Sequence, residues 1–192
     1  MAEIYTRLGD DGSTGLLFGG RVSKSDPLID AVGTLDESVA ALGLARASCA
    51  EPALAECILE VQRGIFVAAA DLAANPHARA HLVPGTSLVT EQMVQRIEEI
   101  IDRRVAARPL RTVFLVPGAT HASAALDLSR TVVRRAERMV VRLLQVGQCR
   151  SPLVLTYLNR ISDLLYVLAR EAAGAADEPI SHEAGAADRP RG

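Results

Sequence analysis

Residues 127–144 read DLSRTVVRRAERMVVRLL, and this stretch has the spacing that recurs along the chain. At about 100° per residue its apolar side chains share one broad face, made by Val132, Val133, Ala136, Met139, Val140, Leu143 and Leu144. Its charged side chains fall on the opposite side, within an arc made by Arg130, Arg134, Glu137 and Arg138. The pattern predicts an amphipathic helix over about residues 120–146 that packs one face into a core.

Four further segments carry the same helical periodicity. They span residues 28–48, 53–74 and 91–107, and a last segment from Ser151-Pro152 to about Ala173. Asp26-Pro27 and Thr90 are expected to begin two of these helices, and Gly174 to end the last. Because most connections are short and no strands alternate with the helices, the sequence predicts an all-α, five-helix up-and-down bundle over residues 27–173.

Three segments outside this pattern have distinct compositions. Residues 1–26 hold five glycines without helical or sustained strand periodicity, and an arm of that kind is either disordered or functional. Residues 112–116, TVFLV, look like a strand locally and are interpreted as a buried, extended connector. Residues 174–192 are polar and aperiodic, so they are expected to form a flexible C-terminal tail.

The overall composition excludes several classes of protein. The chain has 192 residues, 49% of them hydrophobic, enough for one large domain with a sizeable core. A formal net charge of −2 argues against a protein that binds nucleic acid by neutralising phosphates. Three cysteines without CxxC spacing argue against a disulfide framework or structural zinc. No signal peptide or long apolar run is apparent, so we expect a cytoplasmic protein that spans no membrane.

Polar residues on two of the predicted helices are candidates for a binding site. Arg134 and Arg138 are helical neighbours whose charges repel, and Glu137 offsets only part of that charge. This face is either an ordinary solvated surface or a site for an anion such as phosphate. On the last helix, Asn159 and Asp163 lie at i and i+4, and their poor helix propensity means that they are either solvated or needed.

The glycine-rich arm is the second candidate. Residues 6–15, TRLGDDGSTG, offer backbone N–H groups and hydroxyls of the kind that form phosphate-binding concavities. The segment lacks the GK[ST] ending of a Walker A loop, and a flexible N-terminus is the alternative interpretation. Lys24 can add a mobile positive charge. Asp36 and Glu37 point about 100° apart, so they cannot both serve as paired carboxylates in acid–base catalysis. One of them is instead a candidate partner for an arginine.

Three segments together resemble one family. TRLGDDGSTGLLFGGRVSK with DAVGTLDE, then FLVPGATHASAALDLSRTVVRRAER, then NRISDLLYVLAR are similar to PduO-type ATP:cob(I)alamin adenosyltransferases over about residues 5–170. The resemblance implies a homotrimer with active sites between subunits. It implies transfer of the 5′-deoxyadenosyl group of ATP to the cobalt of cob(I)alamin, with Mg²⁺ accompanying ATP and triphosphate released. A cobalamin reductase and a cobalamin-dependent acceptor enzyme are the partners that it suggests.

The resemblance also assigns roles to residues of this chain. The implied ATP-binding residues are Thr6, Arg7, Gly9, Asp10, Gly12, Ser13, Thr14, Lys24, Arg134, Glu137, Arg138 and Asn159. The implied catalytic residues are Asp36, Phe114, Arg130 and Arg134: Asp36 and Arg130 form a salt bridge across the subunit boundary, and Phe114 closes the corrin pocket below the cobalt. The chain departs from the family at Ala119 and Asp127, where members commonly have Gly and His.

Two other functions remain open at this point. Another ATP-dependent transferase or kinase would keep the phosphate-binding residues but need an acidic base near its acceptor. A non-catalytic corrinoid carrier would keep the helical bundle without turnover. The sequence shows no HExxH, GxSxG or Cys/His cluster. That pattern agrees with cobalt(I) chemistry, in which the metal itself is the nucleophile.

Overall fold

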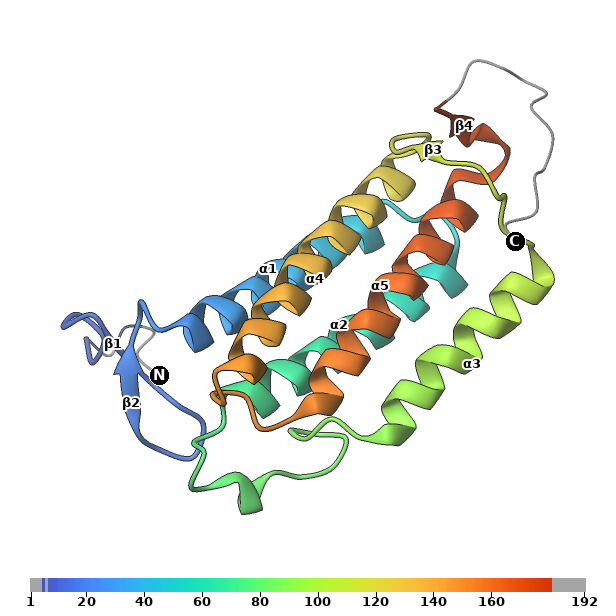
Figure 1. Cartoon of the computed structure of the whole chain (residues 1–192). Coiled ribbons are helices and arrows are strands. Elements are labelled where there is room, and N and C mark those ends of the chain that lie inside the picture. Colours follow the sequence, from blue (N-terminus) through green and yellow to red (C-terminus); the bar gives the residue numbers. More distant parts are fainter. Residues whose placement is uncertain (1–4, 6, 181–192) are drawn as a thin grey trace.

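The computed structural model describes residue 5 and residues 7–180, and five α-helices dominate this part of the chain (Figure 1). The helices are α1 (Pro27–Ala47), α2 (Pro52–Ala73), α3 (Glu91–Ala107), α4 (His121–Gln145) and α5 (Pro152–Ala173). Two single-turn 3₁₀ helices, η1 (Arg79–His81) and η2 (Gly174–Ala176), follow α2 and α5. The predicted all-α bundle is confirmed, and each helix ends within about one residue of its expected bounds.

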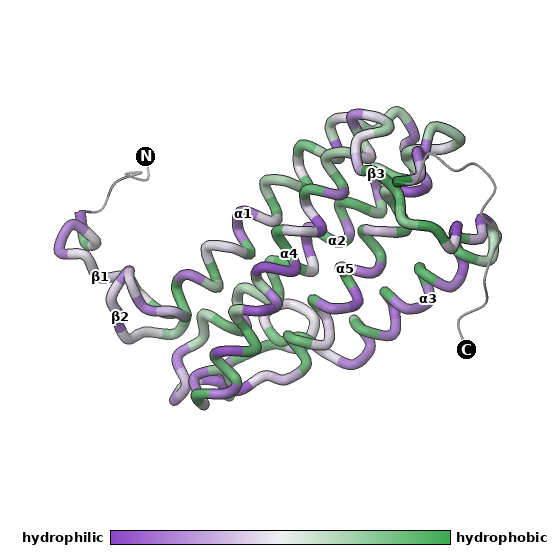
Figure 2. Tube along the Cα trace, turned by 45° about the horizontal axis from the view of Figure 1, so that its top comes forward, coloured by the Kyte–Doolittle hydropathy of each residue, from purple (hydrophilic) through white to green (hydrophobic). Residues whose placement is uncertain are grey.

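The core lies between α1, α2, α4 and α5. The side chains that fill it are fully buried leucines and isoleucines, among them Leu35, Leu42, Ile58, Ile65, Leu126, Leu143, Leu158, Ile161, Leu164 and Leu168. α4 packs between α1 and α5, while α3 lies against the outside of α5. Colouring by hydropathy shows apolar and polar residues alternating along each helix (Figure 2). The apolar face predicted for α4 is therefore confirmed as its core-facing side.

Local capping sets the helix starts. The Asp26 carboxylate accepts a hydrogen bond from the amide of Leu28 at 2.8 Å, directly before Pro27 at the first helical position. Thr90 caps α3 through the amide of Met93 at 3.3 Å. At α4, Thr120 and Ser123 form a reciprocal capping box.

One glycine permits the close approach of α2 and α5. A Cβ atom built on Gly64 would lie 1.8 Å from the Tyr157 hydroxyl oxygen, which is far inside van der Waals contact. Tyr157 is buried, and burial raises the pKa of its hydroxyl. Any larger residue at position 64 would have to push the two helices apart.

The N-terminal arm has more structure than the sequence predicted. β1 (Ser13–Gly15) and β2 (Arg21–Ser23) form a short antiparallel hairpin in which Thr14 pairs with Val22. The turn between these two strands is bonded to the end of α2. The Leu17 amide donates to the Ala73 carbonyl at 2.8 Å, and the Asn75 amide donates to the Leu17 carbonyl at 2.9 Å. The Asn75 side chain also donates to the Gly19 carbonyl at 2.9 Å. These contacts are long-range, so the local sequence pattern did not reveal them.

The connector before α4 corrects another expectation. β3 (Leu115–Val116) pairs with β4 (Glu178–Pro179) as a two-residue antiparallel ladder. The prediction that residues 112–116 are buried is wrong, because the Phe114 side chain is 75% exposed. The first part of the expected tail is also ordered, since residues 174–180 form η2 and β4. Residues 181–192 lie outside the described part of the chain.

The two small sheets lie at opposite ends of the bundle. The β1–β2 hairpin lies beside the start of α1, and β3 and β4 lie beside the start of α4 and the end of α5 (Figure 1). With 25 residues, α4 is about 37 Å long at 1.5 Å per residue. No described helix has the length and apolar character needed to cross a membrane.

Candidate active site

Lys24 lies over the glycine-rich turn of the arm. Its ammonium Nζ donates to the Gly9 carbonyl at 2.8 Å, and its amide donates to the Gly12 carbonyl at 2.9 Å. A Cβ atom at Gly9 would lie 3.1 Å from Nζ, so glycine lets the lysine lie close against the turn. Gly12 has φ +80°, a conformation that glycine adopts without strain. The arm thus places one positive charge beside a tight backbone turn, as a phosphate site requires.

A second group of hydrogen bonds links the residues that follow this turn. The Asp11 carboxylate accepts from the Ser13 amide at 2.9 Å and from the Ser13 hydroxyl at 2.7 Å. These bonds lower the pKa of Asp11, with a smaller contribution from Arg21. Arg21 also donates to the Ser13 hydroxyl at 2.9 Å.

Some amides in the predicted phosphate nest are already in use. The Asp10 amide donates to the Arg7 carbonyl, the Gly12 amide to the Gly9 carbonyl, and the Ser13 amide to Asp11. A phosphate held by these three groups must therefore replace bonds within the arm. Arg7 is exposed with φ +59°, and Thr14 lies half-buried in β1. The predicted ligand Thr6 lies outside the described residues.

The polar face of α4 meets a polar strip on α5. The Glu137 carboxylate accepts from the Asn159 side-chain amide at 3.0 Å, and Arg134 Nη1 lies 3.5 Å from its other oxygen. Arg138 donates to the Arg134 carbonyl at 3.0 Å. Arg134 remains 45% exposed, whereas Glu137 is only 15% exposed. The structure thus brings Arg134, Glu137, Arg138 and Asn159 together and leaves the Arg134 guanidinium open to solvent.

Sequence reasoning gave no role to Arg160, which extends this strip. Its guanidinium donates to the Asn159 side-chain oxygen at 2.9 Å and to Glu98 of α3 at 2.6 Å. Asn159 is therefore held on both sides, by Glu137 and by Arg160. The sequence signal that could have identified Arg160 was its position next to Asn159. Asp163 is exposed, 3.8 Å from Arg160, and fits the solvated alternative.

Asp36 and Glu37, two adjacent acids of α1, have different surroundings. Glu37 forms an ion pair with Arg135 of α4, whereas Asp36 is exposed. Within this single chain, the described ion pairs do not join Asp36 to Arg130. Arg130 instead lies 3.9 Å from Asp127, and its buried Nε finds no hydrogen-bond partner among the described residues. The predicted Asp36–Arg130 bridge stays a prediction about the contact between two subunits.

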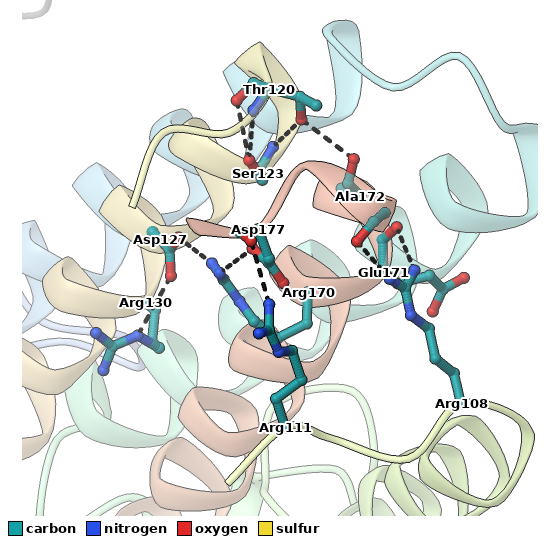
Figure 3. Close-up of polar contacts among 11 residues, drawn as sticks. Arg108, Arg111, Thr120, Ser123, Asp127, Arg130, Arg170, Glu171, Ala172 and Asp177 are labelled. Carbon is teal, nitrogen blue, oxygen red and sulfur yellow. Dashed lines mark hydrogen bonds and ion pairs between the residues drawn. The ribbon is translucent and has the colours of Figure 1, made fainter. Parts of the chain in front are cut away.

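Asp127, where the family commonly has histidine, is part of a buried ion cluster (Figure 3). Its carboxylate pairs with Arg170 of α5, and Arg170 also pairs with Asp177. The three side chains are each 7% exposed or less. Burial raises the pKa of Asp127, while Arg170 and Arg130 oppose that shift. Sequence reasoning missed Arg170 and Asp177 because only the packing of α4 on α5 brings these residues together.

Phe114 lies on an exposed apolar surface at the β3 end. Val113, Val116 and Ile180 are exposed there as well, at 40%, 42% and 62%. Among the described residues, no group of three His, Cys, Asp or Glu side chains is arranged to hold a metal ion. This end of the bundle therefore exposes several apolar side chains, in contrast to the charged turn of the arm.

Comparison with known proteins places the chain in one family. Residues 4–172 match the family described as cobalamin adenosyltransferase. The chain is 35% identical to the corrinoid adenosyltransferase of Citrobacter freundii, over 88% of this chain and 94% of that one. It is 37% identical to the corrinoid adenosyltransferase PduO of Salmonella typhimurium over 94% of this chain, and it spans about half (51%) of that longer relative.

A solved structure extends the agreement to three dimensions. It is a variant of the PduO-type ATP:corrinoid adenosyltransferase from Lactobacillus reuteri, complexed with cobalamin and ATP. Its TM-score to this chain is 0.82 at 30% identity, over 92% of this chain and 98% of that one. The matched region includes the described arm from residue 7 and nearly all of α5. From sequence and structure alike, the chain belongs to the cobalamin adenosyltransferase family.

Proposed function

We propose that this protein transfers the 5′-deoxyadenosyl group of ATP to the cobalt of cob(I)alamin. The observation that carries the proposal is the arrangement around Arg134, in a member of this family. Its exposed guanidinium lies beside Glu137, which Asn159 and α5 fix in place. Forked guanidiniums suit phosphate oxygens, and a triphosphate is the leaving group of this reaction.

The reaction balances without a nucleophilic side chain. Cobalt(I) supplies the electron pair for the new Co–C5′ bond, the C5′–O bond breaks, and triphosphate leaves with that electron pair. The protein then has to place C5′ in line with the cobalt and stabilise the negative charge on the leaving group. We assign this stabilisation to Arg134, Arg138 and Lys24. Mg²⁺ would accompany ATP and neutralise part of the phosphate charge beside these three cations.

Phe114 has the properties required at the lower face of the corrin. It fills space and excludes water without donating a ligand to the metal. Cobalt that lacks a lower ligand is easier to reduce, so Phe114 favours formation of cob(I)alamin on the enzyme. The apolar surface around Phe114 supports this role, because it suits a large flat ligand better than a polyanion.

We further propose that each active site is shared between two copies of the chain in a homotrimer. The arm and Phe114 lie at opposite ends of a bundle whose α4 alone is about 37 Å long. ATP held by the arm therefore could not place its C5′ at a cobalt bound over Phe114 of the same chain. In a closed ring of head-to-tail contacts, every arm meets the neighbouring bundle. This assembly would place Lys24 of one copy beside Arg134 and Asn159 of the next.

One assay separates this function from the two alternatives. The protein is mixed with ATP and chemically reduced cobalamin, and the absorption spectrum of the cobalamin is followed together with the nucleotide products. Adenosyl transfer converts cob(I)alamin to the alkylated form and releases triphosphate. A kinase or other phosphoryl transferase would release ADP instead, and a corrinoid carrier would change the spectrum stoichiometrically without turnover. Either result would refute the proposal.

A further inference from the structure

The segment that follows α5 touches the backbone of the Phe114 loop directly. We call residues 174–180 the strap. The Ile180 amide donates to the Phe114 carbonyl at 3.0 Å, and Leu115 pairs with Pro179 in the β3–β4 ladder. Proline lacks an N–H donor, so the ladder has few hydrogen bonds. A two-residue pair of strands is too short to be stable alone and needs another attachment.

A buried ion pair supplies that attachment (Figure 3). Asp177 of the strap pairs with Arg170, which α5 carries, and Arg170 also pairs with Asp127 of α4. We call these three residues the latch. Arg111, from the segment after α3, donates to the Asp177 carbonyl at 3.2 Å. At the start of the strap, Arg108 donates to the Gly174 carbonyl.

The charges of the latch explain why the strap stays in place. Without Asp177, the buried Arg170 guanidinium would have one acidic partner, Asp127. Asp177 adds a second carboxylate, at the other terminal nitrogen of the guanidinium. Releasing the strap would leave the buried Arg170 with fewer hydrogen bonds, which is costly away from water. The latch therefore holds the strap down, and the strap holds the backbone of Phe114.

We propose that Asp177 is a positioning residue, which fixes Phe114 through the strap. Phe114 is 75% exposed in the chain, so its own side-chain packing does little to fix its position. The inference rests on the proposed function, because the position of Phe114 matters only if Phe114 closes a corrin pocket. Asp177 contacts no reacting atom and acts through the hydrogen bond between Ile180 and Phe114.

The test compares two neighbouring acids of the strap in the full chain. Asp177→Asn keeps the size of the side chain and removes its charge from Arg170. Glu178→Gln removes one charge from the next residue, which is exposed, and serves as the matched control. Arg111→Gln is a second way to weaken the strap without changing a buried residue. Thermal melting of each variant establishes that the bundle remains folded.

Three measurements are made on each variant. Amide exchange at Ile180 reports on the strap, the absorption spectrum of bound cob(II)alamin with ATP reports on the lower ligand, and steady-state kinetics separate kcat from the KM for ATP. Asp177→Asn is expected to speed exchange at Ile180 by about tenfold, the scale of losing one charge-assisted hydrogen bond. It should reduce the four-coordinate share of the cobalt and lower kcat from cob(II)alamin. The KM for ATP should stay unchanged, and Arg111→Gln should act in the same direction.

Several results would overturn the proposal. Faster exchange in Asp177→Asn with a wild-type cob(II)alamin spectrum and kcat would mean that the strap does not position Phe114. Equal effects of Glu178→Gln would assign the change to net charge, and a raised KM for ATP would assign it to general loosening. If the wild-type protein itself forms no Co–C bond, the proposed function fails as well. The exchange comparison then reports separately whether the latch holds the strap.

Discussion

The two ends of the bundle are built by different means. At the arm end, backbone hydrogen bonds from Leu17 and Asn75 tie an exposed, glycine-rich hairpin to α2, and a lysine lies over its turn. At the β3 end, a buried ion cluster holds a strap against a loop that exposes Phe114. The first end has exposed charge beside a glycine-rich backbone turn, whereas the second has apolar surface.

This difference indicates which ligand each end can accept. A polyanion needs cations and N–H groups that water can reach, as around Lys24. A corrin ring needs an apolar face held in a fixed position, as around Phe114. Because one chain separates these two ends by the length of its helices, we propose that a second copy brings the two ligands together.

The largest effect is expected at the middle of α4. Arg134→Ala should cost at least about 2–3 kcal/mol of transition-state stabilisation, the scale of losing a charged hydrogen bond to a developing anion. The measurement is kcat/KM with saturating cob(I)alamin. Arg142→Ala, an exposed arginine further along the same helix, is the control and should keep nearly wild-type kinetics. Near-normal kinetics of Arg134→Ala would remove this residue from the ATP site.

The next prediction concerns the connection between the ends. Lys24→Ala should chiefly raise the KM for ATP, and at low ATP both Lys24→Ala and Arg134→Ala should be nearly inactive as pure proteins. When the two variants are unfolded together and refolded at equal ratio, about a quarter of the contacts in a random ring receive both intact residues. Activity should then rise towards that fraction of wild type.

The complementation experiment needs a check that the subunits exchange. Tagging one variant and isolating mixed oligomers supplies it. Mixed oligomers whose activity never exceeds the sum of the two pure variants would place the whole ATP site within one chain.

A smaller and more selective effect is expected at the β3 end. Phe114→Ala should still bind cobalamin but leave more of the bound cobalt five-coordinate. Turnover should fall most when cob(II)alamin has to be reduced on the enzyme and less when cob(I)alamin is supplied. Phe66→Ala, which makes the same change at an exposed phenylalanine of α2, is the matched control. A bound cob(II)alamin spectrum identical to that of wild type would exclude this role for Phe114.

The sequence predicted the helices well because their signals are local. The periodic spacing of apolar residues, the N-cap aspartate and the C-terminal glycine all act within a few residues of the helix that they mark. The helix α3, for example, has the predicted bounds. The family resemblance assigned both Glu137 and Asn159 to the nucleotide site, and in the structure the Asn159 side-chain amide donates to the Glu137 carboxylate at 3.0 Å. The binding roles of these two residues stay predictions.

The two ends were harder to predict because their structure depends on distant residues. The hairpin is held by bonds from Leu17 to the end of α2, more than fifty positions along the chain. The partner of Asp127 is 43 residues away, and no local pattern marks the strap as a strand. An exposed phenylalanine between Val113 and Leu115 likewise resembles part of a buried strand in sequence alone.

The smallest expected effect is a pH dependence confined to the arm end. The hydrogen bonds from Ser13 lower the pKa of Asp11 in the folded arm, and Arg21 contributes. A carboxyl whose folded-state pKa lies below its unfolded value stabilises the fold above the unfolded value, near 3.9, and loses that contribution as the pH falls through the folded value. Exchange of the Ser13 amide should therefore become less protected in this acidic range.

Asp11→Asn should remove this pH dependence, because its side-chain amide does not titrate in that range and carries no charge for Arg21. The measurement is the NMR titration of the Asp11 carboxyl together with exchange at Ser13, with the amides of α5 as the reference that should not respond. Because Asp11 is exposed, salt should weaken the contribution from Arg21 and leave the shorter hydrogen bonds from Ser13 in place. An Asp11 midpoint at or above the ordinary value would mean that the arm in solution does not keep the turn that brings Ser13 to this carboxylate.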